Sequence, residues 1–165
     1  MATEIFTLIN EAYKDLYGYI ALTPEQIKYY TEAYLSFVNF NLISLVVDPQ
    51  DKLVGVGICM TSFTHALQKA KGKLFPLGAL HMLRAMRKND TMDLYLIAVD
   101  AKYQSKGVNA IIMSDVNNGA LKMGITKAET NIELEDNEKV QSMWKMVTHT
   151  QHKRRRCYIK NITNE

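Results

Sequence analysis

Two helices are predicted at the start of the chain from the spacing of its apolar residues. Residues 5–16 carry an apolar side chain every three or four positions, which is the period of one helix face, and Gly18 ends the run. A second helix is predicted from Thr23 to about Phe37. It opens with Thr-Pro-Glu-Gln, in which Thr and Gln can cap each other's backbone and Pro suits the first turn.

The pattern then changes to that of β-strands. Residues 42–47 and 53–60 are short apolar runs rich in β-formers, and the Asp-Pro-Gln-Asp-Lys turn between them predicts an antiparallel hairpin. Residues 93–99 form a nearly continuous apolar run, which predicts a buried central strand. Two further strands are predicted over residues 125–131 and 155–162.

Two helical pieces are predicted over residues 62–89, with Pro76 where the second piece begins. One face of the second piece is apolar and the other is basic. We expect the apolar face to pack on the core. A lid over an acidic ligand, a dimer contact and a membrane-surface helix remain alternatives. The apolar face consists of Leu77, Leu80, Leu83 and Met86.

Two later helices complete the pattern. The first, over about residues 107–123, joins two strands and therefore implies a parallel pair with a right-handed crossover. The second begins at Asp136 or Asn137 and runs to Val147. No repeat or linker divides the chain, so residues 1–165 are expected to form one mixed α/β domain.

Composition and cysteine count exclude several classes of protein. The chain has 165 residues, 47% hydrophobic and 22% charged, as in an ordinary globular domain. No apolar run approaches the ~20 residues of a membrane span, and no signal-peptide pattern opens the chain. A cytoplasmic protein without a membrane partner is therefore expected. Cys59 and Cys157 lie far apart and the histidines lack ligand spacing, so neither a disulfide nor a metal site is expected.

The net charge of +3 is unevenly distributed. Residues 64–90 have a net charge of +5 and residues 153–156 of +4, so the remainder of the chain is acidic. Segregated positive charge is typical of an anion-binding surface, although a solvated helix and an edge strand explain it equally well. For residues 153–156 we favour a structural role or a contact with a coenzyme phosphate over nucleic-acid binding.

The segment between the third strand and the next helix carries the clearest chemical signal. Val99 ends the strand, and Gly107 stands at the start of the helix. Glycine lets a ligand approach the backbone closely, while the helix start offers free N–H groups and the positive end of the helix dipole. These features together predict a phosphate site.

This segment resembles the pyrophosphate loop of the GCN5-related N-acetyltransferase (GNAT) superfamily, which reads Gln/Arg-x-x-Gly-x-Gly/Ala. Gln104 and Gly107 match, whereas Asn109 departs from the last position. The order of predicted elements also matches. The resemblance implies a mixed, mostly antiparallel central sheet with a splayed parallel strand pair, flanked by helices, and a helical insertion at about residues 61–91.

The family's first strand has no counterpart here. The resemblance therefore implies the C-terminal acetyltransferase-like domain of a longer protein, with an additional N-terminal domain. A sheet edge left uncovered by the missing strand could pair with the same edge of a second copy, so a homodimer is a further expectation.

The co-substrate implied by the resemblance is acetyl-CoA. The loop backbone would bind its pyrophosphate, and its pantetheine arm would lie where the third strand splays from the next. The amide of Val99 would polarise the acetyl carbonyl. The implied coenzyme-binding residues are Ala98, Val99, Gln104, Ser105, Lys106, Gly107, Val108, Asn109 and Asn137.

A carboxylate near the start of the third strand is implied as the catalytic base that takes the proton of the acceptor amine. Asp93 is the first candidate, because an even offset places it on the same strand face as Val99. Glu129 is the second candidate, and Glu133 is a third.

The proton donor to the leaving thiolate is harder to identify. Many family members carry a Tyr seven residues after an Asn on the last helix. Counting from Asn137, that position is Trp144, whose indole is no useful acid. We expect Trp144 in the core, and Tyr95 and Tyr158 are alternative donors.

Three hypotheses for function follow. The first is an acetyl-CoA-dependent N-acetyltransferase that acts on a primary amine, in a small molecule or a peptide, by direct attack. The second is a non-catalytic GNAT-like domain for binding or assembly. The third, a nucleic-acid-binding module, is the least favoured.

Overall fold

The computed structural model describes residues 2–34 and 38–160. The chain forms two compact units, residues 1–131 and residues 132–165. The expected helix end at Phe37 and the last two residues of the predicted final strand lie outside the described residues.

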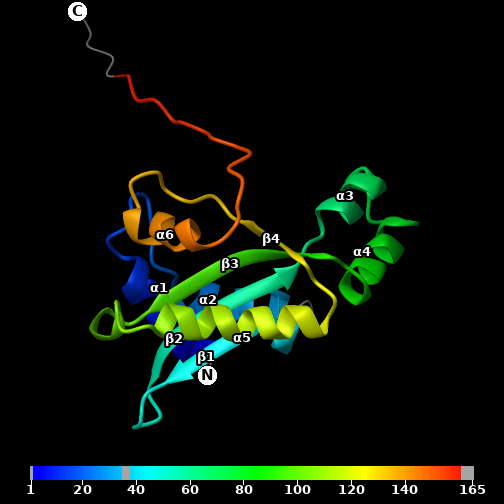
Figure 1. Ribbon diagram of the computed structural model, residues 1–165. Helices are drawn as coiled ribbons and strands as arrows, with labels where there is room; N and C mark the ends of the chain where they lie inside the picture. The colour runs from blue at the N-terminus through cyan, green and yellow to red at the C-terminus, as the bar shows by residue number, and fades with distance from the viewer. Residues whose placement is uncertain (1, 35–37, 161–165) are drawn as a thin grey trace, which may run out of the picture. The chain divides into compact units, whose positions relative to one another are not determined.

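The first unit is built on a four-stranded sheet in the order β1-β2-β3-β4 (Figure 1). β1, β2 and β3 pair antiparallel, and β3 pairs in parallel with β4. This arrangement confirms the predicted hairpin, the mixed sheet and the parallel pair. The strands are β1 (Ile43–Val47), β2 (Leu53–Thr61), β3 (Thr91–Val99) and β4 (Lys127–Thr130).

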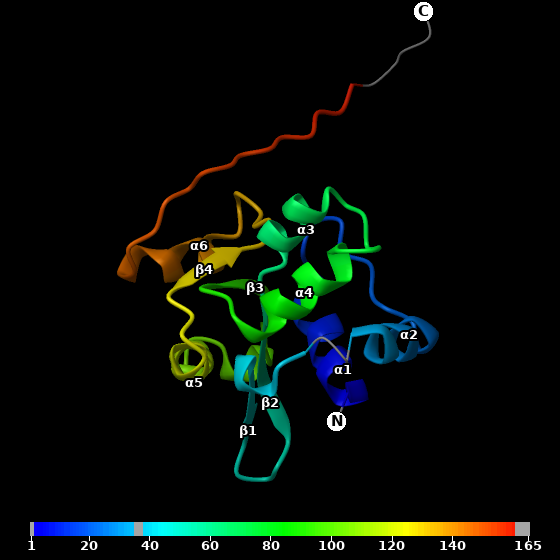
Figure 2. The same cartoon turned by 90° about the vertical axis from the view of Figure 1, so that its right-hand side faces the viewer.

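Helices cover both faces of this sheet (Figure 2). α5 packs on one face through Val116 and Ala120, and α1 packs on the other through Leu8 and Ile9. The helices of the unit are α1 (Ala2–Tyr13), α2 (Pro24–Tyr34), α3 (Thr64–Ala70), α4 (Gly78–Arg87) and α5 (Val108–Lys122), with short 3₁₀ turns η2 (Phe40–Leu42) and η3 (Ala101–Tyr103).

The second helix begins as its sequence predicts. The Thr23 N–H donates to Oε1 of Gln26 at 2.9 Å, and the Gln26 N–H donates to Oγ1 of Thr23 at 3.3 Å. Each residue therefore caps the other, and the first turn of α2 needs no outside partner for these two groups.

α5 lies close against the sheet because β2 presents glycines beneath it. A Cβ built on Gly57 would lie 2.3 Å from Cγ2 of Ile112, and one built on Gly55 would lie 2.7 Å from Cγ1 of Val108. Both α5 residues are buried. The start of α5, and with it the loop that follows β3, is thereby fixed against the middle of the sheet.

The helical insertion is present, but its apolar face is not in the core. α3 and α4 pack on each other at the end of the sheet opposite the β3–α5 loop (Figure 1). Leu77 and Leu80 are each 62% exposed and Leu83 is 56% exposed, so the predicted core packing of this face is wrong. α4 packs instead against α3 and the segment that joins the two helices, where a Cβ on Gly78 would lie 1.9 Å from the carbonyl oxygen of Lys73 and 3.2 Å from Cβ of Ala70.

The second unit contains one helix and an extended tail. α6 (Glu138–Met143) is capped by Asn137, whose side chain accepts from the Val140 N–H at 3.4 Å, and continues as the 3₁₀ turn η4 (Trp144–Met146). The predicted final strand is wrong over residues 155–160, which are exposed and form no strand. A strand needs a neighbour for its backbone groups, and no described segment pairs with this one.

Within the two described stretches of the chain, no helix is long and apolar enough to cross a membrane. The same residues bring no group of His, Cys, Asp and Glu together that could hold a metal ion.

Candidate active site

The loop between β3 and α5 has the backbone that its sequence predicts. Asp100 opens it by accepting from the Lys102 N–H at 2.9 Å. Ser105 and Gly107 then take left-handed conformations, with φ of 60° and 84°. α5 starts directly after Gly107 without a side-chain cap, and nothing lies within 4 Å of a Cβ built on that glycine. The start of α5 is therefore open to an anionic ligand.

Side chains hold this loop in place from two directions. Gln104 Nε2 donates to the carbonyl of Val99 at 3.4 Å, and the Tyr103 hydroxyl donates to Oδ2 of Asp48 at 3.1 Å. Nζ of Lys106 lies 5.4 Å from the centre of the Tyr103 ring. Backbone N–H groups, that of Lys52 foremost, and the Tyr103 hydroxyl lower the pKa of Asp48, which therefore stays charged as an acceptor. The β1–β2 turn and the β3–α5 loop are thus tied together.

The parallel strand pair splays beside this loop. β3 pairs with β4 only from Thr91 to Leu94, and β4 ends at Thr130, opposite Leu94. On the side of β3 away from β2, no strand among the described residues of the first unit continues alongside residues 95–99. The last part of β3 therefore presents an open edge next to the start of α5, as the resemblance implies.

A bulge at Tyr95 changes which way the residues of β3 face. Ile58 of β2 is opposite Leu96, and the next residue, Cys59, is opposite Leu94, so Tyr95 is an extra residue. In a regular strand, two residues an odd number of positions apart face opposite sides of the sheet. Met92 and Val99 are seven positions apart, yet both pack against α5, because the bulge lies between them.

The expected placement of Asp93 and Val99 on one strand face is therefore wrong. Met92 faces α5, so its neighbour Asp93 faces the side of α1, whereas Val99 faces α5. The even offset between the two residues fails because the bulge inserts one residue into the alternation.

The direction in which the backbone N–H and C=O groups point also alternates along β3. The Asp100 N–H donates to the carbonyl of Val54 at 2.9 Å, which identifies that pair as hydrogen-bonded. Hydrogen-bonded and non-hydrogen-bonded pairs alternate along an antiparallel ladder. Ala98, opposite Val56, therefore points its N–H and C=O toward β2. Ile97 and Val99 point theirs toward the open edge.

Tyr13 of α1 reaches this open edge. Its hydroxyl donates to the carbonyl of Ile97 at 2.9 Å and accepts from the Ile97 N–H at 3.2 Å. Burial is the main cause of a raised pKa for Tyr13. Sequence reasoning assigned this residue only to the first helix. The one available signal was a hydroxyl-bearing side chain within an apolar helix face.

Asp93 and Glu129, the two expected bases, are brought together. They are cross-strand partners in the β3–β4 pair. Burial is the largest cause of a raised pKa for Asp93, the charge of Glu129 adds to it, and a hydrogen bond with the Ser62 side chain opposes it. A carboxyl with a raised pKa beside an open strand edge is suited to accept a proton.

Tyr95 lies near this pair. Its pKa is raised first by burial and then by the charge of Asp93. The other expected proton donor, Tyr158, is 86% exposed in the second unit.

The remaining expected residues belong to the second unit. Asn137 caps α6, and the Trp144 indole N–H donates to both oxygens of Glu133, at 3.0 and 2.9 Å. Trp144 is partly exposed, so its expected place in the core is wrong. Glu133, the third expected base, is engaged by this indole and by Gln141 Nε2 at 3.2 Å.

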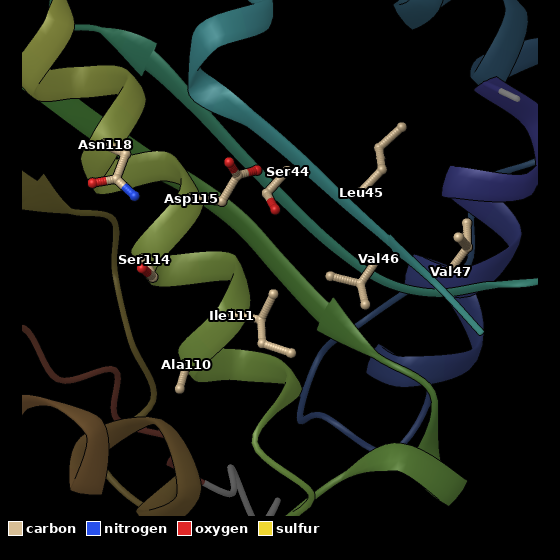
Figure 3. A pocket seen from close by; sticks show the side chains of 9 residues that line it. All are labelled: Ser44, Leu45, Val46, Val47, Ala110, Ile111, Ser114, Asp115 and Asn118. Atoms are coloured by element: carbon tan, nitrogen blue, oxygen red, sulfur yellow. The ribbon is translucent and has the colours of Figure 1, made fainter. Parts of the chain in front are cut away.

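A cavity of about 650 Å³ lies elsewhere, between β1 and α5 (Figure 3). Val46 and Ile111 give it apolar walls, while Ser44 and Asp115 add polar atoms. The Ser44 hydroxyl is buried and has no hydrogen-bond partner. None of the expected site residues lines this cavity.

No family model and no curated protein matches the chain, but solved structures match it over nearly its whole length. A possible acetyltransferase from Clostridium difficile 630 is 15% identical, with a TM-score of 0.60, over 97% of this chain and 92% of its own. Glucosamine-6-phosphate N-acetyltransferase from Arabidopsis thaliana is 13% identical, with a TM-score of 0.56, over 94% and 93%. AAC(6')-Iy, solved with the bisubstrate analogue CoA-S-monomethyl-acetylneamine, is 10% identical, with a TM-score of 0.58, over 98% and 92%. The chain therefore has the fold of the GCN5-related N-acetyltransferase superfamily.

Proposed function

We propose that the chain is an acetyl-CoA-dependent N-acetyltransferase that moves an acetyl group to a primary amine by direct attack. The observation that carries this proposal is the adjacency of two features. The uncapped start of α5 at Gly107 stands next to the open edge of β3 at residues 95–99. Solved acetyltransferases share the fold in which the two features occur.

The phosphate end of the coenzyme would bind at the β3–α5 loop. Backbone N–H groups from Gln104 to Asn109 and the dipole of α5 supply its attraction for the pyrophosphate. Asn109 carries a side chain where the family motif has Gly or Ala, and it lies in the first turn of α5 rather than at a left-handed position. Asn137 remains a proposed further contact.

The acyl end would lie along the open edge of β3. Ala98 turns its backbone groups toward β2 and the Ile97 N–H donates to the Tyr13 hydroxyl, so Val99 would supply the N–H for the acetyl carbonyl. An N–H that donates to the carbonyl oxygen stabilises the negative charge that develops there during attack.

Asp93 would take the proton of the attacking amine, directly or through water, with Glu129 raising its basicity. Asp93 faces the side of α1, from which the acceptor would approach. A small-molecule or peptide amine is proposed as the acceptor. Among proteins of similar fold, one is named for its action on glucosamine 6-phosphate, and another was solved with an acetylneamine conjugate of CoA.

Calorimetric titration of acetyl-CoA into the purified chain tests this proposal. We expect binding in the micromolar range, and Gly107→Glu to weaken it by ~10-fold or more, because its carboxylate would repel the pyrophosphate. Gly124→Glu is the matched control. Gly124 also has a left-handed backbone, with φ of 76°, but lies after the opposite end of α5. Equal weakening by both variants, or no binding by the folded chain, would contradict the proposal.

A non-catalytic acyl-CoA-binding domain is the second candidate. The engagement of the Trp144 indole with Glu133, at the position where the family often has an acidic Tyr, favours it. Release of the CoA thiol with a panel of primary amines separates the two: turnover supports the enzyme, and binding without turnover supports the second candidate.

A further inference from the structure

The exposed side of α4 carries leucines and arginines together. Leu80 stands three positions before Leu83 and four before Arg84, and Arg87 follows Leu83 by four. Residues at these spacings lie on one side of a helix, and all four of these side chains are exposed. Gly78, the buried residue of α4, packs against α3 and the connecting segment. The exposed side is therefore apolar and basic at once, instead of having the separate apolar and basic faces that were predicted.

The segment that joins α3 to α4 extends this exposed side. Phe75 is 78% exposed, and Leu74 beside it is exposed as well. Lys71 and Lys73 precede them and are also exposed. The two helices and the segment between them stand at one end of the sheet (Figures 1 and 2). We call the exposed side chains of residues 69–88 the α3–α4 surface.

The positive charge of the α3–α4 surface is not neutralised within the described part of the chain. Residues 64–88 contain six Lys and Arg residues and no Asp or Glu. All six are exposed, and none forms an ion pair with another described residue. An occupant of this surface must therefore supply negative charge and must also cover apolar side chains. The six basic residues are Lys69, Lys71, Lys73, Arg84, Arg87 and Lys88.

Two kinds of occupant meet only one of these requirements. A nucleic acid would neutralise the basic residues, but its charged backbone gives leucine side chains no place to be buried. A second copy of the chain would cover the leucines, but it would bring a second set of positive charges against the first, which repels it at ordinary ionic strength.

An anionic lipid bilayer meets both requirements. Leucine and phenylalanine side chains are buried at the boundary between headgroups and acyl chains, while Arg and Lys reach the lipid phosphates on their long apolar stems. Anionic headgroups also attract basic residues that lie near the bilayer surface. We propose that the α3–α4 surface docks onto the surface of an anionic lipid bilayer.

This docking is peripheral, so it needs no helix that crosses the bilayer. The expectation of no membrane partner rested on the absence of a spanning segment, whereas α4, with 10 residues, would lie on the bilayer surface. The docking does not depend on the proposed function. The β3–α5 loop lies at the opposite end of the sheet from α3 and α4, so it stays open to its ligand in the docked chain (Figure 1).

Co-sedimentation with vesicles tests the proposal. The full chain is mixed with vesicles of phosphatidylcholine and phosphatidylserine, and with vesicles of phosphatidylcholine alone, at ~0.1 M salt. We expect binding to the anionic vesicles to be at least ~10-fold tighter, because several basic residues contribute to it. Raising the salt concentration to ~1 M should weaken that binding by ~10-fold or more, since the attraction is then screened.

Two double variants separate the apolar contribution from the charged one. Leu80→Ala with Leu83→Ala keeps every charge and should weaken binding to the anionic vesicles by ~10-fold or more. Arg84→Gln with Arg87→Gln keeps the leucines and should weaken binding by a similar factor. All four residues are exposed, so both variants should keep the fold, which thermal unfolding followed by circular dichroism checks.

Matched double variants elsewhere on the first unit are the controls. Ile111→Ala with Leu121→Ala removes two apolar side chains that are 55% and 58% exposed on α5. Lys28→Gln with Lys122→Gln removes the same amount of charge from α2 and α5. We expect both controls to bind the anionic vesicles within a few-fold of wild type.

Several results would overturn the proposal. Absence of wild-type binding to the anionic vesicles would do so, and so would equal losses in the α4 variants and their controls. Binding that the leucine variant does not weaken would show adsorption by charge alone, without docking of the apolar side chains. A DNA duplex that binds more tightly than the vesicles, with no loss in the leucine variant, would assign the surface to nucleic acid instead.

Discussion

Asp93 and Glu129 act as a coupled pair at the scale of single residues. Because the Glu129 charge and burial both raise the pKa of Asp93, removing that charge lowers it. We expect Glu129→Gln to shift the acidic limb of the pH profile of kcat/KM to lower pH. Ser62→Ala should shift it to higher pH, since a hydrogen bond that favours the carboxylate is lost. Shifts of the same sign in both variants would contradict the assignment of this limb to Asp93.

The same pair links activity to stability. A carboxyl whose folded pKa is above its unfolded value stabilises the fold at low pH, and that stability is lost as pH rises through the folded pKa. At pH 7, above the unfolded pKa of an aspartate, the raised folded pKa of Asp93 therefore costs stability. We expect Asp93→Asn to raise the midpoint of urea unfolding at pH 7 and to lower kcat/KM by ~10²–10⁴-fold. An unfolding midpoint below that of wild type would show that the carboxylate stabilises the fold.

The two cysteines differ sharply in their surroundings. Burial raises the pKa of Cys59 to about 12, whereas Cys157 is exposed. The thiolate is the reactive form, so Cys59 should be inert in the folded chain. We expect a thiol reagent at pH 8 to label Cys157 alone, and to label both residues in denaturant. The variant Cys157→Ser should show no fast labelling under native conditions.

At the scale of elements, the contact between β2 and α5 has no spare room. A Cβ on Gly57 would lie 2.3 Å from Ile112. We expect Gly57→Ala to lower the free energy of unfolding by ~1–3 kcal/mol, measured in urea. Adding Ile112→Ala should cost less in the Gly57→Ala background than in wild type, because the colliding methyl group is then gone. Additive effects of the two substitutions would contradict a direct clash.

Which elements could be predicted from the sequence depended on how local their causes are. The start of α2 could be predicted because Thr23 and Gln26 lie within one turn of helix. The β1–β2 hairpin could be predicted because its two apolar runs flank a short turn sequence. The Tyr95 bulge has no local signal, because the register is decided by β2. Residues 155–160 have strand-forming side chains, yet a strand also needs a partner, which the residues themselves do not supply.

At the scale of the whole molecule, the α3–α4 insertion concentrates exposed apolar surface and positive charge. Residues 64–88 contain six Lys and Arg residues and no Asp or Glu. Leu74, Phe75, Leu77, Leu80 and Leu83 are exposed on the same segment. Two such surfaces attract through their apolar side chains and repel through their charges.

This balance predicts a salt-dependent association. Raising the ionic strength from ~0.1 M to ~1 M shortens the screening length from ~10 Å to ~3 Å, which removes the repulsion and leaves the apolar attraction. We expect sedimentation velocity to show more self-association at high salt, and Leu80→Glu with Leu83→Glu to abolish it. Association that weakens with salt would place the contact elsewhere.

The residues of the site could be predicted from the sequence only where their partners lie close to them along the chain. The β3–α5 loop lies within a dozen consecutive residues, so Gln104 and Gly107 were found from the motif. Asp93 and Glu129 were each found, but their pairing depended on the parallel register of β3 and β4. Tyr13 was missed because 84 positions separate it from Ile97, and only the folded sheet joins them.

The bulge at Tyr95 has a consequence for how this sequence can change over evolutionary time. Before the bulge, the even-numbered residues Met92 and Leu94 face α5, and after it the odd-numbered residues Ile97 and Val99 do. Deleting Tyr95 would remove the extra residue and leave the other side chains of the strand on their present faces, whereas one more inserted residue would exchange inside for outside along half the strand. Among descendants of this chain, the stretch should therefore tolerate the loss of one residue at this point much more often than the gain of one.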